Sequence, residues 1–410
     1  MKKQLLHYFL GQLAPAISGI ILIVLAVRLL GEEEYGFYAV IYSSLVLIHN
    51  LFFGWVQQSL LRFISQYENL RKVVLNKFLF INSLSAISAG LTAFILSLLF
   101  FKLDVSNALW IGSFMVLYVF LTFYLISFQA FFKTAYYAFT NTFYYLGYII
   151  FFLILIYTLE NGSYMLIFKS MVFTLILIHI YALSRLHKKF KINFSKAFVD
   201  KDFIKRAFNF GFPLTLWLFV SLLLGFSDRY IIFYYLGAEE TGTYTAIYDM
   251  FYKISTFVCL PVLYAFHPQI MDLWNKDKRD EAVRLIKKAM KIEIAAALAF
   301  ILLLIPIAPP VIFNLLKLEG AHLHLISIVI VAGGFAWQLA MFAHKPQELL
   351  FRQKFMLAGV ILALLLNISL NFLFIPVYGI TAAAFTTLIS AVFYLLIMSA
   401  DSLKIRKRLH

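Results

Sequence analysis

Long apolar runs separated by short polar connections recur along the whole chain. Twelve such runs lie near residues 8–30, 37–61, 78–101, 108–132, 136–158, 164–185, 208–235, 243–271, 291–315, 323–344, 355–376 and 379–400. A helix of about 20 apolar residues crosses roughly 30 Å of hydrocarbon. The pattern therefore predicts an all-α polytopic membrane protein with 12 transmembrane helices. Several connections are so short that consecutive helices are expected to run antiparallel.

A sequence motif at the end of the first run occurs again half a chain length later. Leu30–Tyr42 and Leu236–Tyr248 share Leu, Gly, Glu, Glu, Gly, Tyr, Ile and Tyr in register. Self-similarity at one fixed offset indicates internal duplication, although generic turns between membrane helices are the alternative. In each copy, glycine is expected to end one helix and the glutamates to favour the start of the next. We expect these glutamates to be structural.

The duplication predicts two six-helix lobes, residues 1–185 and 207–410, joined by a basic cytoplasmic linker over 186–206. Because six is even, both lobes enter the membrane in the same direction. A pseudo-two-fold axis along the membrane normal would then relate them, as in transporters built from parallel repeats. Substrate sites in such proteins lie between the lobes.

Composition and charge agree with a membrane location. Hydrophobic residues make up 63% of the chain and charged residues 13%. Of 35 Lys and Arg residues, 29 fall in connections on the same side as the N-terminus, which marks that side as cytoplasmic. We therefore expect a multi-pass protein of the cell inner (plasma) membrane with both termini cytoplasmic. The net charge of +15 then reflects topology and contact with anionic membrane lipids, and no nucleic-acid partner is expected.

Motifs for enzymatic or cofactor chemistry are missing from the sequence. One cysteine, Cys259, excludes an intramolecular disulfide. His322 and His324 lack carboxylate partners at metal-ligand spacing. There is no Walker loop and no dinucleotide-binding glycine motif. We expect neither a metal nor a cofactor, and no enzymatic activity.

Charged residues within the apolar runs are the candidate functional groups, because charges in hydrocarbon are costly and usually mark a pathway. Asp249 and Lys253 are four residues apart, so they should share a helix face and can pair. Arg62 follows the second run at its cytoplasmic end, where it either binds phosphate oxygens or is an ordinary positive charge of the cytoplasmic side. The other charges within the runs are Arg28, Lys169, Asp228 and Arg229. They are interpreted either as a structural ion-pair network or as the wall of a cavity for an anionic substrate, with a titrating carboxylate.

Three stretches resemble the polysaccharide-export and flippase branch of the multidrug/oligosaccharidyl-lipid/polysaccharide exporter superfamily. They are residues 28–38 with 57–67, residues 227–244 with 267–270, and residues 371–384, where Thr381 replaces a frequent glycine. The resemblance implies two lobes forming a V, with a central cavity lined by the first, second, seventh and eighth spans. Members of the family move lipid-linked oligosaccharides to the outer leaflet and are generally thought to use an ion gradient.

The resemblance implies residue roles at matching positions. Arg28, Arg62, Arg229 and Lys253 would bind the substrate, a polyprenyl pyrophosphate-linked oligosaccharide, and Asp228 or Asp249 would couple to H⁺ or Na⁺. The alternatives are a cation-coupled multidrug or small-molecule antiporter of the same superfamily, and a membrane glycosyltransferase or polymerase. The antiporter predicts mainly acidic binding residues, and the transferase predicts a long outer loop with catalytic groups.

Overall fold

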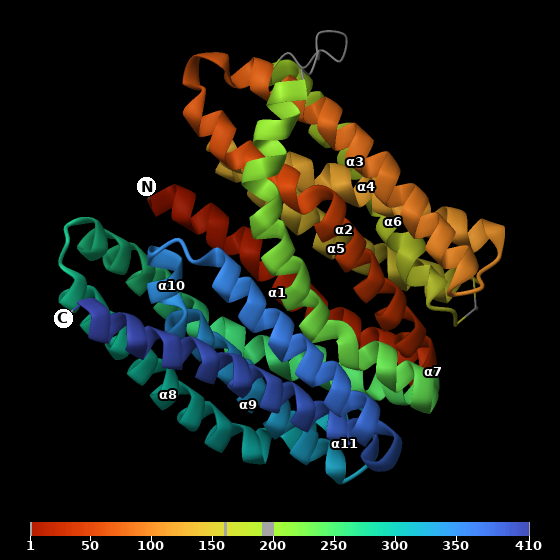
Figure 1. Ribbon diagram of the computed structural model, residues 1–410. Coiled ribbons are helices and arrows are strands. Elements are labelled where there is room, and N and C mark those ends of the chain that lie inside the picture. Colours follow the sequence, from red (N-terminus) through yellow and green to blue (C-terminus); the bar gives the residue numbers. More distant parts are fainter. Residues whose placement is uncertain (1, 160–161, 191–200, 410) are drawn as a thin grey trace. The chain divides into compact units, whose positions relative to one another are not determined.

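The structure is a computed structural model that describes residues 2–159, 162–190 and 201–409. All regular elements in those ranges are helices, and the long ones are shown in Figure 1. They are α1 (Lys2–Leu30), α2 (Glu32–Gln66), α3 (Arg71–Leu99), α4 (Val105–Ala130), α5 (Thr134–Leu159), α6 (Met165–Phe190), α7 (Lys201–Asn275), α8 (Arg279–Pro309), α9 (His322–Ala343), α10 (Lys345–Leu349) and α11 (Gln353–Leu409). Two short helical segments, Glu68–Leu70 and Pro310–Leu316, complete the described structure.

The all-α membrane fold predicted from the apolar runs is confirmed. Within the described ranges, ten helices are long and apolar enough to cross a membrane. Two of them are far too long for one crossing: α7 has 75 residues and α11 has 57. A straight helix of 75 residues would extend over roughly 110 Å, several times the thickness of the hydrocarbon layer.

Both long helices contain a glycine with a non-helical backbone. Gly237 in α7 has φ 86° and ψ −173°, and Gly379 in α11 has φ 62° and ψ −151°. Figure 1 shows α11 folding back on itself, so that its C-terminal end lies beside α10. The side chain of Thr386 donates a hydrogen bond to Asn371, joining the two arms across the turn at Gly379. Each long helix is thus a helical hairpin, and the count of 12 spans stays a prediction.

The polar connection between the predicted runs 243–271 and 291–315 is mostly helical. Helix α8 begins at Arg279 and continues into the apolar run. Asp280 and Glu281 occupy its first turn, where carboxylates favour the positive end of the helix dipole. The buried positions Ala282, Ile286 and Ala289 recur at helical spacing and pack with Phe342. The segment is an amphipathic extension of a membrane helix rather than a loop.

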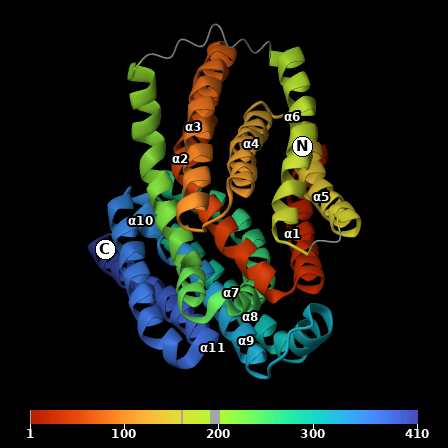
Figure 2. The same ribbon diagram turned by 90° about the vertical axis from the view of Figure 1, so that its right-hand side faces the viewer.

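The described chain divides into two compact units. Unit 1 contains the residues up to Leu30 and Ile41–Phe219, and unit 2 contains Gly31–Val40 and the residues from Val220. In unit 1, α3 packs on α4, α4 on α6, and α5 on both α1 and α6 (Figure 2). In unit 2, α9 packs on α8 and α11. The predicted lobes 1–185 and 207–410 stay a prediction.

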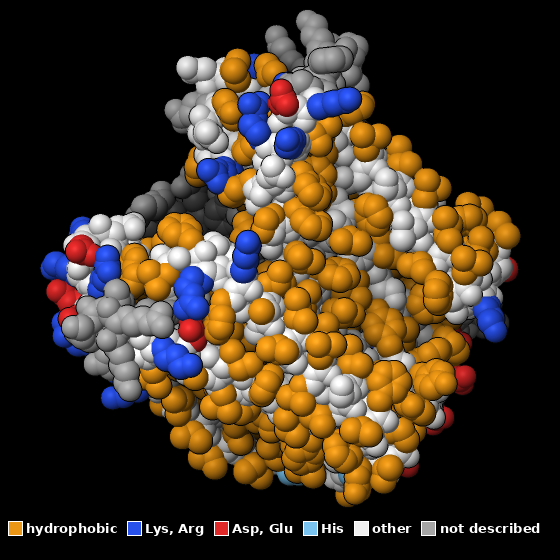
Figure 3. Space-filling model, in the orientation of Figure 1, with side chains coloured by type: hydrophobic (Ala, Val, Ile, Leu, Met, Phe, Trp, Pro, Cys, Tyr) orange, Lys and Arg blue, Asp and Glu red, His pale blue; other side chains and the backbone are white. Residues whose placement is uncertain are grey.

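The surface is apolar over much of the helical part. Figure 3 shows one face largely covered by hydrophobic side chains, with Lys and Arg side chains gathered toward its edges. Large exposed hydrophobic residues occur on both units, among them Leu91, Ile150, Leu302 and Leu365. An exposed apolar area of this extent is typical of a surface that contacts lipid.

Candidate functional site: a buried polar network and exposed cations

The two copies of the repeated motif adopt the same local structure. Gly31 and Gly237 have φ values of 90° and 86°, a conformation that glycine adopts without the steric cost of a Cβ atom. Glu32, Glu33 and Glu34 lie in the first turn of α2. The prediction that this glycine ends one helix and the glutamates begin the next is confirmed for the first copy. In the second, Gly237 is likewise the point where α7 reverses.

The second glycine of each copy makes a reciprocal contact within unit 2. A Cβ atom on Gly36 would overlap the carbonyl oxygen of Ala238, and one on Gly242 would overlap that of Glu32. The same hypothetical atoms would lie 2.9 Å from the Gly242 nitrogen and 3.0 Å from the Gly36 nitrogen. Equivalent positions of the two copies therefore touch backbone to backbone, in the close approach that small residues permit between membrane helices.

A fully buried carboxylate, Asp228 of α7, is the centre of a polar network in unit 2. Its Oδ2 accepts hydrogen bonds from the Tyr244 hydroxyl at 2.5 Å and the Thr387 hydroxyl at 3.1 Å. Its Oδ1 accepts one from the backbone N–H of Arg229 at 3.0 Å. Three donors compensate part of the cost of burying this group.

The network continues through α11. Ser227 donates a hydrogen bond of 2.7 Å to the amide oxygen of Asn367, which also accepts one of 2.9 Å from Asn371. Asn367 and Asn371 are fully buried. Thr386 then links Asn371 to the second arm of α11. The result is a group of carboxylate, amide and hydroxyl oxygens inside a helical bundle, the ligand types that suit hard cations.

Arg229 joins the network to the second arm of α7. Its Nη2 lies 2.7 Å from Asp249 Oδ1, and its guanidinium carbon lies 4.8 Å from the Phe226 ring centroid and 5.4 Å from that of Tyr248. The expected pairing of Asp249 with Lys253 is wrong. Asp249 is paired with Arg229, which the turn at Gly237 places opposite it, whereas Lys253 is exposed and makes no ion pair within the described residues.

The remaining predicted site residues are exposed cations. Arg28 and Arg62 belong to unit 1 and Lys253 to unit 2, and all three side chains are exposed. The guanidinium carbon of Arg62 lies 4.1 Å from the ring centroid of Phe210, a cation–π contact that holds it beside the first turns of α7. Of the six predicted residues, the structure thus brings Asp228, Arg229 and Asp249 together and leaves three cations on helix surfaces.

The sequence-based reasoning missed Tyr244, Thr387, Asn367 and Asn371 as members of the site. Two signals were available. Asn367 and Asn371 are four residues apart in an otherwise apolar run, so they share one helix face. Tyr244 aligns with Tyr38, so both copies of the repeated motif have a tyrosine at this position. No cluster of three or more His, Cys, Asp or Glu side chains suited to a metal occurs in the described part of the chain.

The long apolar helices define a multi-pass membrane protein. The fold is similar to an inward-facing multidrug-resistance transporter of the MATE family and MOP superfamily (TM-score 0.73, 15% identity, covering 97% of this chain and 95% of the other). It is equally similar to the lipid II flippase MurJ in an inward closed conformation (TM-score 0.73, 14% identity, 98% and 91%). A MOP superfamily transporter from Pyrococcus furiosus, described as having a binding pocket of reversed polarity, matches with a TM-score of 0.60 (16% identity, 98% and 92%).

The family follows from the sequence match. The model of the polysaccharide biosynthesis protein family matches residues 1–274, about two thirds of the chain. The chain belongs to this family. No curated protein sequence matches it. The predicted resemblance to a polysaccharide-export family is confirmed at the level of this family.

Proposed function

We propose that this protein transfers a lipid-linked saccharide, carried on a polyprenyl pyrophosphate, from the cytoplasmic to the outer leaflet by alternating access. It would act in the cell inner membrane and use a gradient of H⁺ or Na⁺. Membership of the polysaccharide biosynthesis family supports the substrate class. The resemblance to both a lipid flippase and drug transporters supports movement of a substrate across the membrane. It does not distinguish a lipid substrate from a drug.

The observation that favours an anionic substrate is the sign of the exposed charges. Among the six predicted site residues, the exposed ones are Arg28, Arg62 and Lys253. Both carboxylates are engaged: Asp228 is buried under three donors, and Asp249 is paired with Arg229. Arginine binds phosphate oxygens in a bidentate geometry and lysine binds them as a point charge. A pyrophosphate matches this charge distribution better than a cationic drug does.

The two alternatives make different predictions. A cation-coupled drug antiporter requires acidic side chains that a bulky cationic substrate can reach, whereas Asp228 is fully buried and Asp249 is paired with Arg229. A glycosyltransferase or polymerase requires a long loop with catalytic groups. The connection between α3 and α4 spans only residues 100–104, and α1 and α2 are separated by Gly31 alone. Absence of enzymatic activity stays an expectation.

Substitution of the exposed cations tests the substrate assignment. Arg62→Ala and Lys253→Ala should abolish surface polysaccharide in a flippase-null strain that carries the variant gene, while membrane insertion is unchanged. Arg284→Ala and Lys354→Ala, which also remove exposed cations, are the matched controls and should export normally. Lipid-linked intermediates should accumulate in the two inactive strains. Wild-type export by both Arg62→Ala and Lys253→Ala would remove the site assignment, and efflux of a cationic dye instead would favour the antiporter.

The oxygen atoms around Asp228 support cation coupling at this residue. The carboxylate, the Asn367 and Asn371 amides and the Thr387 hydroxyl lie on α7 and the two arms of α11. A cation bound to them would hold three helical segments together. Asp249 is the weaker candidate, because its carboxylate already neutralises Arg229.

Thermal unfolding measures this coupling directly. A ligand that binds only the folded state stabilises it in proportion to RT ln(1 + [L]/Kd). If Na⁺ is the coupling ion, the Tm of the purified protein should rise with NaCl but not with KCl, and Asp228→Asn should remove the difference. If H⁺ is the coupling ion, the two salts should act alike and transport should follow the pH gradient. If Asp228→Asn responds to salt and pH as the wild type does, Asp228 is not the coupling residue.

A further inference from the structure

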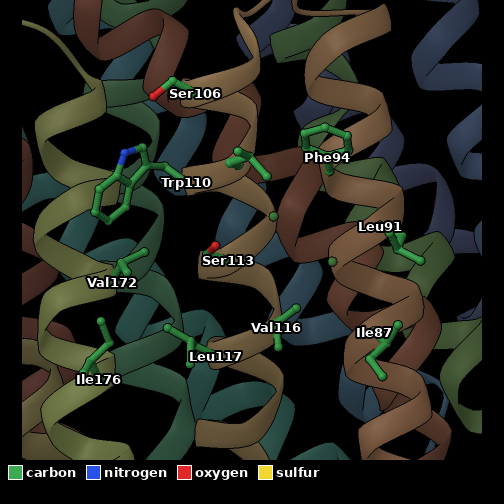
Figure 4. A pocket seen from close by; sticks show the side chains of 13 residues that line it. Ile87, Leu91, Phe94, Ser106, Trp110, Ser113, Val116, Leu117, Val172 and Ile176 are labelled. Atoms are coloured by element: carbon green, nitrogen blue, oxygen red, sulfur yellow. The ribbon is translucent and has the colours of Figure 1, made fainter.

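An apolar groove lies in unit 1, apart from the polar network. It has a volume of about 770 Å³ and is formed by α3, α4 and α6, a size typical of ligand pockets. Figure 4 shows Leu91 and Phe94 of α3 on one side, Val172 and Ile176 of α6 on the other, and Ser113 of α4 between them. Leu91 and Ile176 are also exposed to the surroundings, so the groove is open to lipid.

The depth of the groove matches one leaflet. Its lining on α4 begins at Ser106, the second residue of that helix, and ends at Leu117. The eleven helical steps from Ser106 to Leu117 correspond to roughly 16 Å, about half the thickness of the hydrocarbon layer. On α6, Ile176 lies eleven residues after the helix start at Met165, at the same depth. A chain lying in this groove would belong to the leaflet in which α4 and α6 begin.

An indole ring lines the groove toward its shallow end, and a cation lies beside this ring. The Lys169 Nζ of α6 is 6.0 Å from the ring centroid of Trp110, which lines the groove, and Phe173 packs edge-on against the same ring at 5.6 Å. Lys169 is four residues from the start of α6 and Trp110 five from the start of α4. Both are therefore roughly 6–8 Å into their helices. Lysine and tryptophan at this depth are typical of the membrane interface.

We propose that this groove binds an anionic phospholipid, with one acyl chain between α3, α4 and α6 and the phosphate at Lys169. The apolar lining matches a hydrocarbon chain, the depth matches one leaflet, and the single cation matches a headgroup with one negative charge. A polyprenyl chain fits less well, because it is much longer than one leaflet. The site is separate from the proposed substrate-binding residues and does not depend on the proposed function.

Lipid retention by the full-length purified protein tests this site. Native mass spectrometry in detergent would compare dioleoylphosphatidylglycerol with dioleoylphosphatidylcholine. Ser113→Phe fills the groove from an exposed position, and Ile176→Trp fills it from α6. Each substitution should lower the affinity for one bound lipid molecule, of either type, about tenfold or more, since every buried methylene contributes to lipid affinity. Lys169→Gln should lower the affinity for phosphatidylglycerol about fivefold and leave that for phosphatidylcholine unchanged. Lys169→Arg should keep the affinity for phosphatidylglycerol at the wild-type level.

Matched controls separate the site from general effects on the membrane surface. Ser88→Phe adds the same ring at an exposed position of α3 outside the groove, and Lys317→Gln removes an exposed lysine in unit 2. Both should retain lipid as the wild type does. Unchanged retention in Ser113→Phe and Ile176→Trp would overturn the proposal. Equal loss of both lipids in Lys169→Gln, or displacement of phosphatidylglycerol by a polyprenyl phosphate at equal concentration, would overturn the assignment of the occupant.

Discussion

The guanidinium of Arg229 is 3% exposed and lies between two aromatic rings and the Asp249 carboxylate. Removing one member of a buried ion pair leaves the other charge without compensation, which costs on the order of 3–5 kcal/mol. Arg229→Ala and Asp249→Ala should therefore each lower the Tm of the purified protein substantially. The double variant should lose less than the sum, because the residues act on one another directly.

An exposed pair provides the comparison. Lys276 and Asp272 also lie 2.7 Å apart, but their side chains are 62% and 59% exposed. Exposed ion pairs contribute little to stability, so Lys276→Ala should leave the Tm nearly unchanged. Additive losses in the Arg229 and Asp249 variants would show that the contact between them does not contribute to stability.

Single residues show where sequence-based prediction succeeded and where it could not. The apolar context alone identified Asp228, Arg229 and Asp249 as unusual, because few charges occur in such runs. Their partners depended on the turn at Gly237, which brings residues 20 positions apart into contact. Helical spacing favoured Lys253 as the partner of Asp249. Sequence spacing identifies neighbours on one helix, whereas the Arg229–Asp249 pair joins the two arms of α7.

Two helical elements meet at the second glycines of the repeat. Because Gly36 and Gly242 each face the backbone of the other copy, an added methyl group forces the helices apart. Gly36→Ala and Gly242→Ala should each destabilise the protein by about 1–3 kcal/mol. The double variant should lose less than the sum, since both substitutions disrupt one contact. Thermal unfolding of the purified variants measures both effects.

Gly225 of α7 is the matched control, because a Cβ atom there would have its nearest neighbour, the Tyr248 hydroxyl, at 3.8 Å. Gly225→Ala should be neutral or stabilising, since alanine favours a helix by about 1 kcal/mol over glycine. A loss in Gly225→Ala as large as that in Gly36→Ala would mean that the close contact is not the cause.

The first glycine of the repeat acts through its own backbone. Around Gly237 a Cβ atom would find no neighbour within 4 Å, yet φ 86° and ψ −173° lie in a region essentially restricted to glycine. Gly237→Ala should cost about 1–3 kcal/mol. Gly237→Asn should be as destabilising as Gly237→Ala. Asparagine tolerates the left-handed helical region, but the backbone of Gly237 lies outside that region. Gly162→Ala, also in open space but without a positive φ, should have no effect on the Tm.

At the level of elements, the sequence predicted the turns better than their packing. The shared letters of the motif located Gly31 and Gly237 as helix-ending positions, because glycine followed by glutamates is a local signal. The reciprocal contact of Gly36 with Gly242 was not predictable, since no local pattern states which two backbones will meet. The run predicted to begin at residue 291 omits the amphipathic start of α8 for a similar reason, because the apolar positions there are explained only by their packing with Phe342.

For the whole molecule, the distribution of Lys and Arg predicts the orientation in the membrane, and the two helical hairpins provide sites that test it. If α7 and α11 each cross the membrane twice, the turns near Gly237 and Gly379 lie outside. Glu239 and Tyr378 are exposed beside these turns, whereas Lys133 and Asp277 are exposed in connections predicted to be cytoplasmic. The single native cysteine, Cys259, is buried, so Cys259→Ala gives a suitable background for labelling.

Cysteines introduced one at a time in that background should divide into two groups. Glu239→Cys and Tyr378→Cys should react with a membrane-impermeant maleimide in intact cells. Lys133→Cys and Asp277→Cys should react only after the membrane is permeabilised. The basic connections stay on the cytoplasmic side because moving them across the bilayer is unfavourable. Labelling of all four sites from outside, or protection of Tyr378→Cys, would contradict the 12-span topology and with it the like-oriented halves on which alternating access is proposed to depend.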